Sequence, residues 1–91
     1  MEVVDFCKLI KDHFQILGDR IRANPKYLRC VGPPYKPEDP SCKSVDVPTH
    51  GVNYTLIAPL VILRVLRKFE ITEEAFKEAY NALFSGLKRV K

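Results

Sequence analysis

Apolar residues recur with helical spacing over the first quarter of the chain and predict an amphipathic helix at residues 3–23. They are separated by one, three or four positions, as on one face of an α-helix, while charged side chains fall mostly off that face. The predicted helix ends before Pro25, because proline disfavours the α conformation in the preceding residue. The apolar stripe consists of Val3, Phe6, Cys7, Ile10, Phe14, Leu17 and Ile21.

The segment 25–51 has no such pattern and is rich in proline. Pro33, Pro34, Pro37 and Pro40 fall within eight positions. Proline lacks an amide N–H and fixes φ, so neither a helix nor a central strand is expected to run through this segment. The sequence predicts a long irregular loop, and a short β-hairpin formed by residues 26–31 and 44–47 is the alternative.

The second half of the chain predicts two further helices, at residues 59–69 and 72–86. Pro59 suits a first helical turn, and the following residues are so apolar that this helix is expected to be the central element of the core. Thr72 is a favourable N-cap, and Glu73 and Glu74 complement the helix dipole. The predicted fold is a mainly α single domain (residues 1–91) of three helices with a long proline-rich loop.

Length and composition favour a small protein that works by contact. A chain of 91 residues builds only a modest core, and such a core often gains stability from a partner protein or from self-association. No signal peptide is visible, and the longest uncharged apolar run, 56–63, is too short to span a bilayer. We therefore expect a cytoplasmic protein without membrane contact; its many Lys, Arg and Glu residues are compatible with a thermophilic source.

The cysteines and histidines offer little chemistry. Cys30 and Cys42 flank the proline cluster, so they either form a disulfide that closes a short loop or remain free thiols. Zinc would need these two with His50 and a fourth ligand, yet neither cysteine has a second one at the spacing usual in zinc sites. No nucleophile–base pair or phosphate-binding loop is evident, so we expect no catalytic residues, no metal and no cofactor.

Basic residues form two groups that could contact nucleic acid. The formal net charge is +4, and its excess lies in residues 52–91. One group shares a helix face at i, i+3 and i+4, and the other lies at the chain end. Helix–turn–helix docking is disfavoured because the second helix would bring three glutamates to the phosphates. The candidate residues are Arg64, Arg67 and Lys68 in the first group, and Lys88, Arg89 and Lys91 in the second.

The proline-rich loop is the predicted protein-binding surface. A stiff loop that carries aromatic side chains loses little entropy when it docks on another protein. The sequence thus predicts a non-catalytic interaction module, an accessory subunit or adaptor of a larger intracellular assembly. Assemblies that process nucleic acid are among the candidates. The alternative is a small basic protein that contacts the DNA or RNA backbone without strong sequence specificity. The predicted partner-binding residues are Tyr27, Tyr35, Lys36, Pro37 and Lys43.

Overall fold

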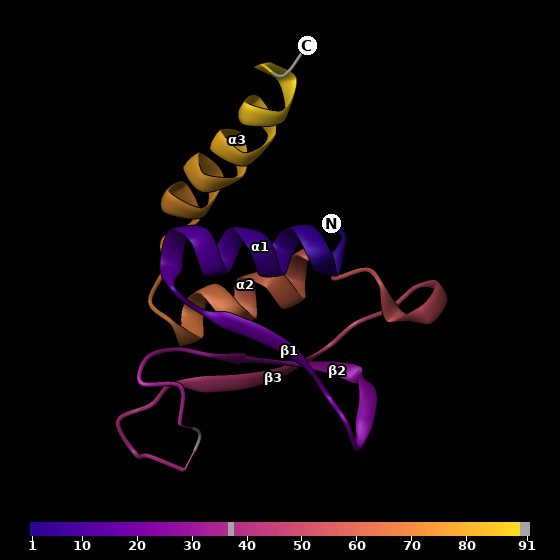
Figure 1. Cartoon of the computed structure of the whole chain (residues 1–91), viewed down its shortest axis with the longest axis vertical. Helices are drawn as coiled ribbons and strands as arrows, with labels where there is room; N and C mark the ends of the chain where they lie inside the picture. The colour runs from indigo at the N-terminus through magenta and orange to yellow at the C-terminus, as the bar shows by residue number, and fades with distance from the viewer. Residues whose placement is uncertain (37, 90–91) are drawn as a thin grey trace.

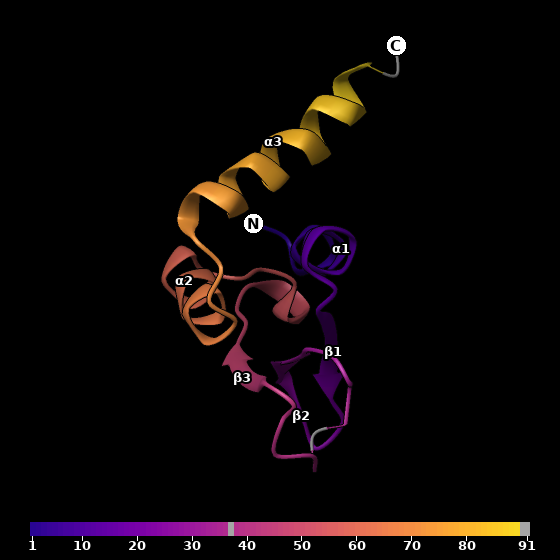
Figure 2. The same ribbon diagram turned by 90° about the vertical axis from the view of Figure 1, so that its left-hand side faces the viewer.

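The computed structural model describes residues 1–36 and 38–89, with side chains as far as Leu83, and has an α+β fold. Two helices, α1 and α2, lie on one side of a three-stranded antiparallel sheet, and α3 extends away from it (Figures 1 and 2). The prediction of a mainly α fold was wrong. The elements are α1 (Val3–Phe14), β1 (Leu17–Ile21), β2 (Asn24–Val31), β3 (Ser44–Pro48), the short 3-10 helix η1 (Val52–Tyr54), α2 (Pro59–Lys68) and α3 (Glu73–Arg89).

The predicted first helix, 3–23, is the main error. Helix α1 ends at Phe14, because Gln15 adopts the left-handed conformation (φ 57°) and its N–H caps the last turn. The chain then reverses into β1, where Gly18 lies close to α1: a Cβ at Gly18 would lie 2.8 Å from Cys7 Sγ. Leu17 and Ile21 fit the helical spacing by coincidence, since strand pairing with residues further along the chain decides their conformation.

The sheet has the strand order β1–β2–β3, so β2 is central. Leu28 pairs with Val47 and Cys30 with Val45 across β2 and β3. These strands lie close to the β-hairpin of residues 26–31 and 44–47 that the sequence offers as the alternative to a loop. The expectation that the prolines prevent a central strand in this segment was wrong. Pro25 is tolerated at the very start of β2, where the pairing with β1 is irregular, and the proline cluster lies beyond the strand.

The core lies between the sheet and the two helices that cover it. Phe6, Leu9 and Ile10 of α1 are fully buried with Leu28 of β2 and Val65 of α2. The Phe6 ring also meets Phe76 of α3, with ring centroids 6.2 Å apart. Helix α1 therefore contacts both the sheet and α3.

The last two helices lie close to where the sequence predicts them. Helix α2 is one residue shorter than the predicted 59–69, and α3 runs past Gly86 to Arg89 where the prediction ended at 86. Thr72 acts as the N-cap, because its hydroxyl accepts a hydrogen bond from the Ala75 N–H at 3.1 Å. The C-terminal turns of α3 point away from the rest of the molecule (Figures 1 and 2).

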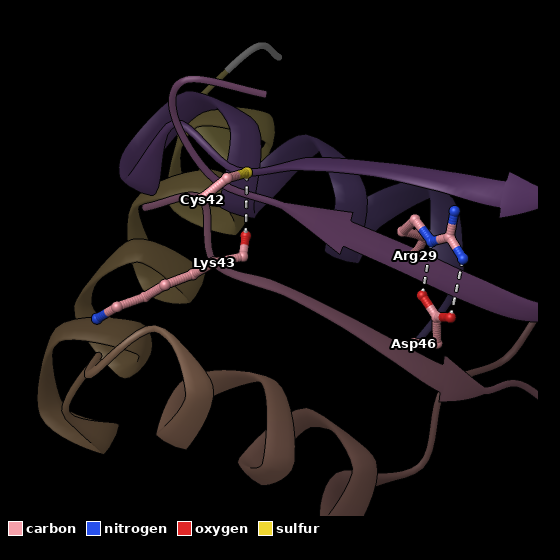
Figure 3. Close-up of polar contacts among 4 residues, drawn as sticks. All are labelled: Arg29, Cys42, Lys43 and Asp46. Atoms are coloured by element: carbon pink, nitrogen blue, oxygen red, sulfur yellow. Dashed lines mark hydrogen bonds and ion pairs between the residues drawn. The ribbon is translucent and has the colours of Figure 1, made fainter. Parts of the chain in front are cut away.

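In the part of the chain that the structure describes, no helix covers the other face of the sheet, which carries a row of charged residues across its strands. Arg29 of β2 stands opposite Asp19 of β1 and Asp46 of β3. The Arg29 guanidinium donates two hydrogen bonds to the Asp46 carboxylate, at 2.8 and 3.1 Å (Figure 3). These hydrogen bonds hold the pKa of the Asp46 carboxyl below its ordinary value.

The Arg29–Asp46 pair gives a stability term that depends on pH. Because the folded-state pKa of Asp46 is lowered, the term is present above the ordinary Asp pKa and is lost as pH falls through the lowered value. We expect Asp46→Asn to lower the free energy of unfolding near neutral pH by less than about 1 kcal/mol, with no difference at about pH 2. Urea unfolding of wild type, Asp46→Asn, Arg29→Gln and the double variant measures the coupling free energy between the two side chains. If the changes in unfolding free energy of the single variants simply add in the double variant, the pairing is contradicted.

The orientation of the helices can be tested with two valines of opposite exposure. Val65 of α2 is fully buried, whereas Val4 of α1 is 74% exposed. Val65→Ala should lower the free energy of unfolding by about 2 kcal/mol, because it removes buried methyl groups and leaves a cavity. Val4→Ala is the matched control and should change the free energy by less than about 0.5 kcal/mol. Equal effects in chemical denaturation would contradict the packing.

Candidate protein-binding groove

The proline-rich loop is folded back on its own chain. The Gly32 N–H donates to the Lys43 carbonyl at 2.9 Å, which continues the β2–β3 pairing into the loop, and further turns close at residues 35, 39 and 42. Tyr35 adopts φ 66°, and its hydroxyl donates to the Gln15 carbonyl at 2.9 Å. The hydroxyl of Tyr35 therefore stabilises the turn that ends α1.

The predicted partner-binding residues do not form one surface. Tyr27 is half-buried opposite Pro48, at the end of β2 away from the loop. Lys43 forms an ion pair with Glu70 at 2.7 Å, which links the base of the loop to the turn after α2. Lys36 is exposed, and Pro37 lies outside the described residues. Tyr35 and Lys43 thus have structural roles within the chain, and whether they also bind a partner stays a prediction.

The cysteines of this region are free thiols. Cys30 is buried in the core opposite Val45, whereas Cys42 lies in the loop before β3, where its thiol contacts the Gly32 carbonyl at 3.4 Å. The strand pairing thus matches Cys30 with Val45 and not with Cys42, and the two cysteines are not joined. The Cys42 thiol donates weakly to carbonyls nearby, among them that of Lys43 (Figure 3). Burial raises the pKa of the Cys30 thiol to about 12.

The two thiols should differ sharply in reactivity. At about pH 8, a pKa of about 12 leaves roughly one Cys30 in ten thousand as the reactive thiolate. We expect an alkylating reagent to label Cys42 in the folded protein and Cys30 only after unfolding, as measured by mass spectrometry of peptides. Cys42→Ser should remove the Cys42 adduct and leave Cys30 protected. A Cys30–Cys42 disulfide after air oxidation would contradict the register.

An apolar concave surface lies between α2 and α3. We call it the α2–α3 groove; its volume is about 360 Å³. Ile62 and Leu66 are buried at its floor, while Leu63 and Phe76 are half-buried in its walls. The groove is lined by Pro59, Ile62, Leu63, Leu66, Glu73, Phe76, Lys77 and Tyr80.

Exposed apolar side chains continue the groove along α2. Leu60 is 79% exposed and shares a second, smaller hollow with Leu63, Arg64 and Arg67. These four residues follow one another at i, i+3, i+4 and i+7, so they form one stripe on the helix. The expectation that α2 is the central core element was wrong for this face, because α3 diverges from α2 and leaves its apolar side chains exposed.

Cationic side chains are exposed next to the groove on α2. Arg64, Arg67 and Lys68 are exposed there, as predicted for a shared helix face; they lie outside the groove lining, and Arg64 and Arg67 line the neighbouring hollow with Leu60. In the part of the chain that the structure describes, neither these three cations nor Lys77 of α3 lies within ion-pair distance of a carboxylate. The charged residues that the described lining of the groove contains are Lys77 and Glu73. The positive charge of this region therefore lies on α2 beside the groove.

The second predicted basic group lies elsewhere. Helix α3 carries positions 88 and 89 away from α2, so its backbone separates them from the first group (Figure 1). The side chains of Lys88 and Arg89 lie outside the described side chains, and Lys91 lies outside the described residues. The six predicted nucleic-acid contacts thus do not come from a single helix face.

The residues considered for catalysis and for zinc are not assembled. In residues 1–36 and 38–89, no group of three or more His, Cys, Asp or Glu side chains is placed to hold a metal ion. His50 is exposed, and its backbone pairs with Leu56. Burial raises the pKa of the Cys7 thiol, and a raised pKa makes a thiol less nucleophilic near neutral pH. The absence of catalysis stays a prediction.

Comparisons with protein-family models, with curated proteins and with solved structures found no significant match to this chain. In the part of the chain that the structure describes, no helix is both long and apolar enough to cross a membrane. The geometry and charge of the α2–α3 groove therefore carry the functional argument. The basic residues beside it on α2 were predicted from their spacing, whereas Lys77 in its lining was not. Its apolar residues were assigned to the core, because spacing does not reveal which face of a helix its neighbours leave exposed.

Proposed function

We propose that this protein is a non-catalytic protein-binding module, an accessory subunit or adaptor that holds a partner protein in the α2–α3 groove. The observation that carries the proposal is an apolar groove whose wall residue Leu63 also lines a second hollow with Leu60, which is 79% exposed. Contiguous exposed apolar surface with a polar rim is characteristic of interaction sites on soluble proteins. The intracellular assembly to which the module would belong is part of the same proposal.

The energetics of the groove suit an anchor site. Full burial of a Leu side chain contributes about 1.5–3 kcal/mol, so Leu60 and Leu63 together offer several kcal/mol to a partner. Association itself costs about 4–15 kcal/mol. The apolar anchors must therefore act together with the cations beside the groove on α2 and with aromatic contact from Tyr80, which lines the groove and is 39% exposed. Aromatic and arginine side chains around an apolar centre are typical of interface hot spots.

Direct DNA or RNA binding is the second candidate, because Arg64, Arg67 and Lys68 share one exposed face without carboxylate partners in the described part of the chain. An apolar groove next to the cations favours a protein partner over phosphates, since phosphate binding uses charge and hydrogen-bond donors. A mobility shift with generic duplex at low salt that is lost in Arg64→Glu/Arg67→Glu would support the second candidate.

Site-specific crosslinking tests the proposed function. A photoreactive phenylalanine analogue at Leu60 should crosslink to a second protein in the native cell extract, because that exposed side chain lies in the hollow that adjoins the groove at Leu63. The same analogue at Val4, which is 74% exposed on α1, is the matched control and should give no such product.

The product from Leu60 should disappear when Leu63→Asp is added, because a carboxylate in the wall opposes burial of an apolar side chain. Gel analysis with mass spectrometry identifies the products. Identical products from Leu60 and Val4, or none from Leu60, would count against the α2–α3 groove as the binding site.

A further inference from the structure

We infer that the occupant of the α2–α3 groove is a second copy of this chain, bound so that α2 of each copy lies on α3 of the other. The inference rests on the proposed function, because it takes the groove as a protein-binding site, and it names the partner. The shape of the helix pair, the opposite charges on its two helices and the exposed apolar side chains support it.

Helices α2 and α3 are the two arms of a V that meet at the turn around Glu70 (Figures 1 and 2). A twofold axis along the middle of such a V exchanges the arms, so that α2 of one copy lies on α3 of the other, and α3 on α2. Each contact is then made twice, as in any dimer of identical chains with a twofold axis. The two grooves face each other, and their apolar walls enclose a common core between four helices.

Each helix carries a second stripe next to its groove wall, which we call its outer stripe. On α2 it is the stripe of the smaller hollow, and it shares Leu63 with the groove wall. On α3 the corresponding positions have the same i, i+3, i+4 and i+7 spacing, and the shared residue is Lys77. Every residue of the two outer stripes except Leu63 is exposed. The outer stripe of α2 consists of Leu60, Leu63, Arg64 and Arg67, and that of α3 consists of Glu74, Lys77, Glu78 and Asn81.

The outer stripes carry charges of opposite sign at matching distances from the turn. Arg67 and Glu74 lie three and four residues from Glu70, and Arg64 and Glu78 lie six and eight residues from it. In the described part of the chain, none of these two arginines and two outer-stripe glutamates lies within ion-pair distance of an opposite charge. When the arms are exchanged, Arg67 faces the partner's Glu74 and Arg64 faces the partner's Glu78. Charges that stay unpaired within one chain are thus paired between two copies.

The charges also select between two symmetric arrangements. A twofold axis across the V would place α2 on α2 and α3 on α3, and would set arginines against arginines and glutamates against glutamates. Lys77 does not reverse this pattern, because Glu73 precedes it by four residues on the same helix, a spacing at which Glu and Lys attract each other. The exchanged arrangement, with α2 on α3, is therefore the one that the charges favour.

The exposed apolar side chains meet in the same arrangement. Leu60 lies ten residues before Glu70 and is 79% exposed, whereas Tyr80 lies ten residues after it and is 39% exposed. Leu60 of each copy therefore comes next to the partner's Tyr80, and the groove residues Leu63 and Phe76 of both copies are covered. Burial of this surface stabilises the dimer by about 25 cal/mol for each Å² of apolar area removed from water. Self-association also suits a chain whose own core is small.

Sedimentation equilibrium of the full chain tests the inference and should show a reversible monomer–dimer equilibrium at concentrations up to about 1 mM. Arg64→Glu/Arg67→Glu should weaken the dimer about a hundredfold, because it sets carboxylates against the partner's Glu74 and the partner's Glu78. Glu74→Lys/Glu78→Lys should weaken it to a similar extent. The variant with all four substitutions should bind within about tenfold of the wild type, because its charges are again complementary with both signs reversed.

Lys8→Glu/Lys11→Glu on the exposed face of α1 is the matched control. It lowers the formal net charge by the same four units as Arg64→Glu/Arg67→Glu, and it should leave the dimer unchanged. Circular dichroism verifies that each variant is folded, as expected because the substituted side chains are all exposed. Photocrosslinking from Leu60 in the purified protein should give a product of twice the chain mass, joined to the peptide that contains Tyr80.

A chain that stays monomeric up to about 1 mM would overturn the inference. A Leu60 crosslink to a different protein in the native cell extract would then leave the proposed function standing. A dimer that neither charge reversal weakens would overturn the placement of α2 on α3, and so would a dimer that the variant with four substitutions fails to restore. A monomeric chain without any Leu60 crosslink would overturn both proposals.

Discussion

The start of the chain is hydrogen-bonded to the segment just before α2, and the placement of the helices depends on this contact. The Val3 N–H donates to the Thr55 carbonyl at 2.8 Å, and the Ile57 N–H donates to the Met1 carbonyl at 2.9 Å. Residues more than fifty positions apart thereby fix the starting points of α1 and α2 beside each other. Both helices then lie on the same face of the sheet. Helix α3 contacts α1 on the side of α1 that faces away from the sheet.

The sequence predicted those parts of the fold that depend on local signals. Thr72 caps α3 as expected, and the proline cluster lies in a loop. The first hairpin was missed because Leu17 and Ile21 keep the helical spacing of the preceding stripe, while their strand conformation depends on pairing of β1 with β2, from Leu17 with Val31 to Ile21 with Asn24. Local periodicity contains no information about such distant pairing.

The same limit applies to the candidate site. The shared face of Arg64, Arg67 and Lys68 follows from spacing within one helix and was predicted. The exposure of Leu60 depends on the angle at which α3 leaves α2, which no pattern along the chain specifies. An apolar helical pattern in a sequence therefore predicts that one face of the helix is buried. Only the structure shows whether another element of the chain packs on that face or leaves it exposed to a partner. The functional proposal follows from this one geometric fact.

The ion pair between Lys43 and Glu70 has a consequence for the groove on the far side of α2. Glu70 lies in the turn between α2 and α3, and the adjacent Phe69 ring packs so closely on Gly32 that a Cβ there would lie 3.0 Å from it. The base of the proline-rich loop thus holds the turn that sets the angle between the two helices. The base of the loop, closed by the Gly32–Lys43 hydrogen bond, therefore belongs to the support of the groove, and none of the described residues of the loop lines it.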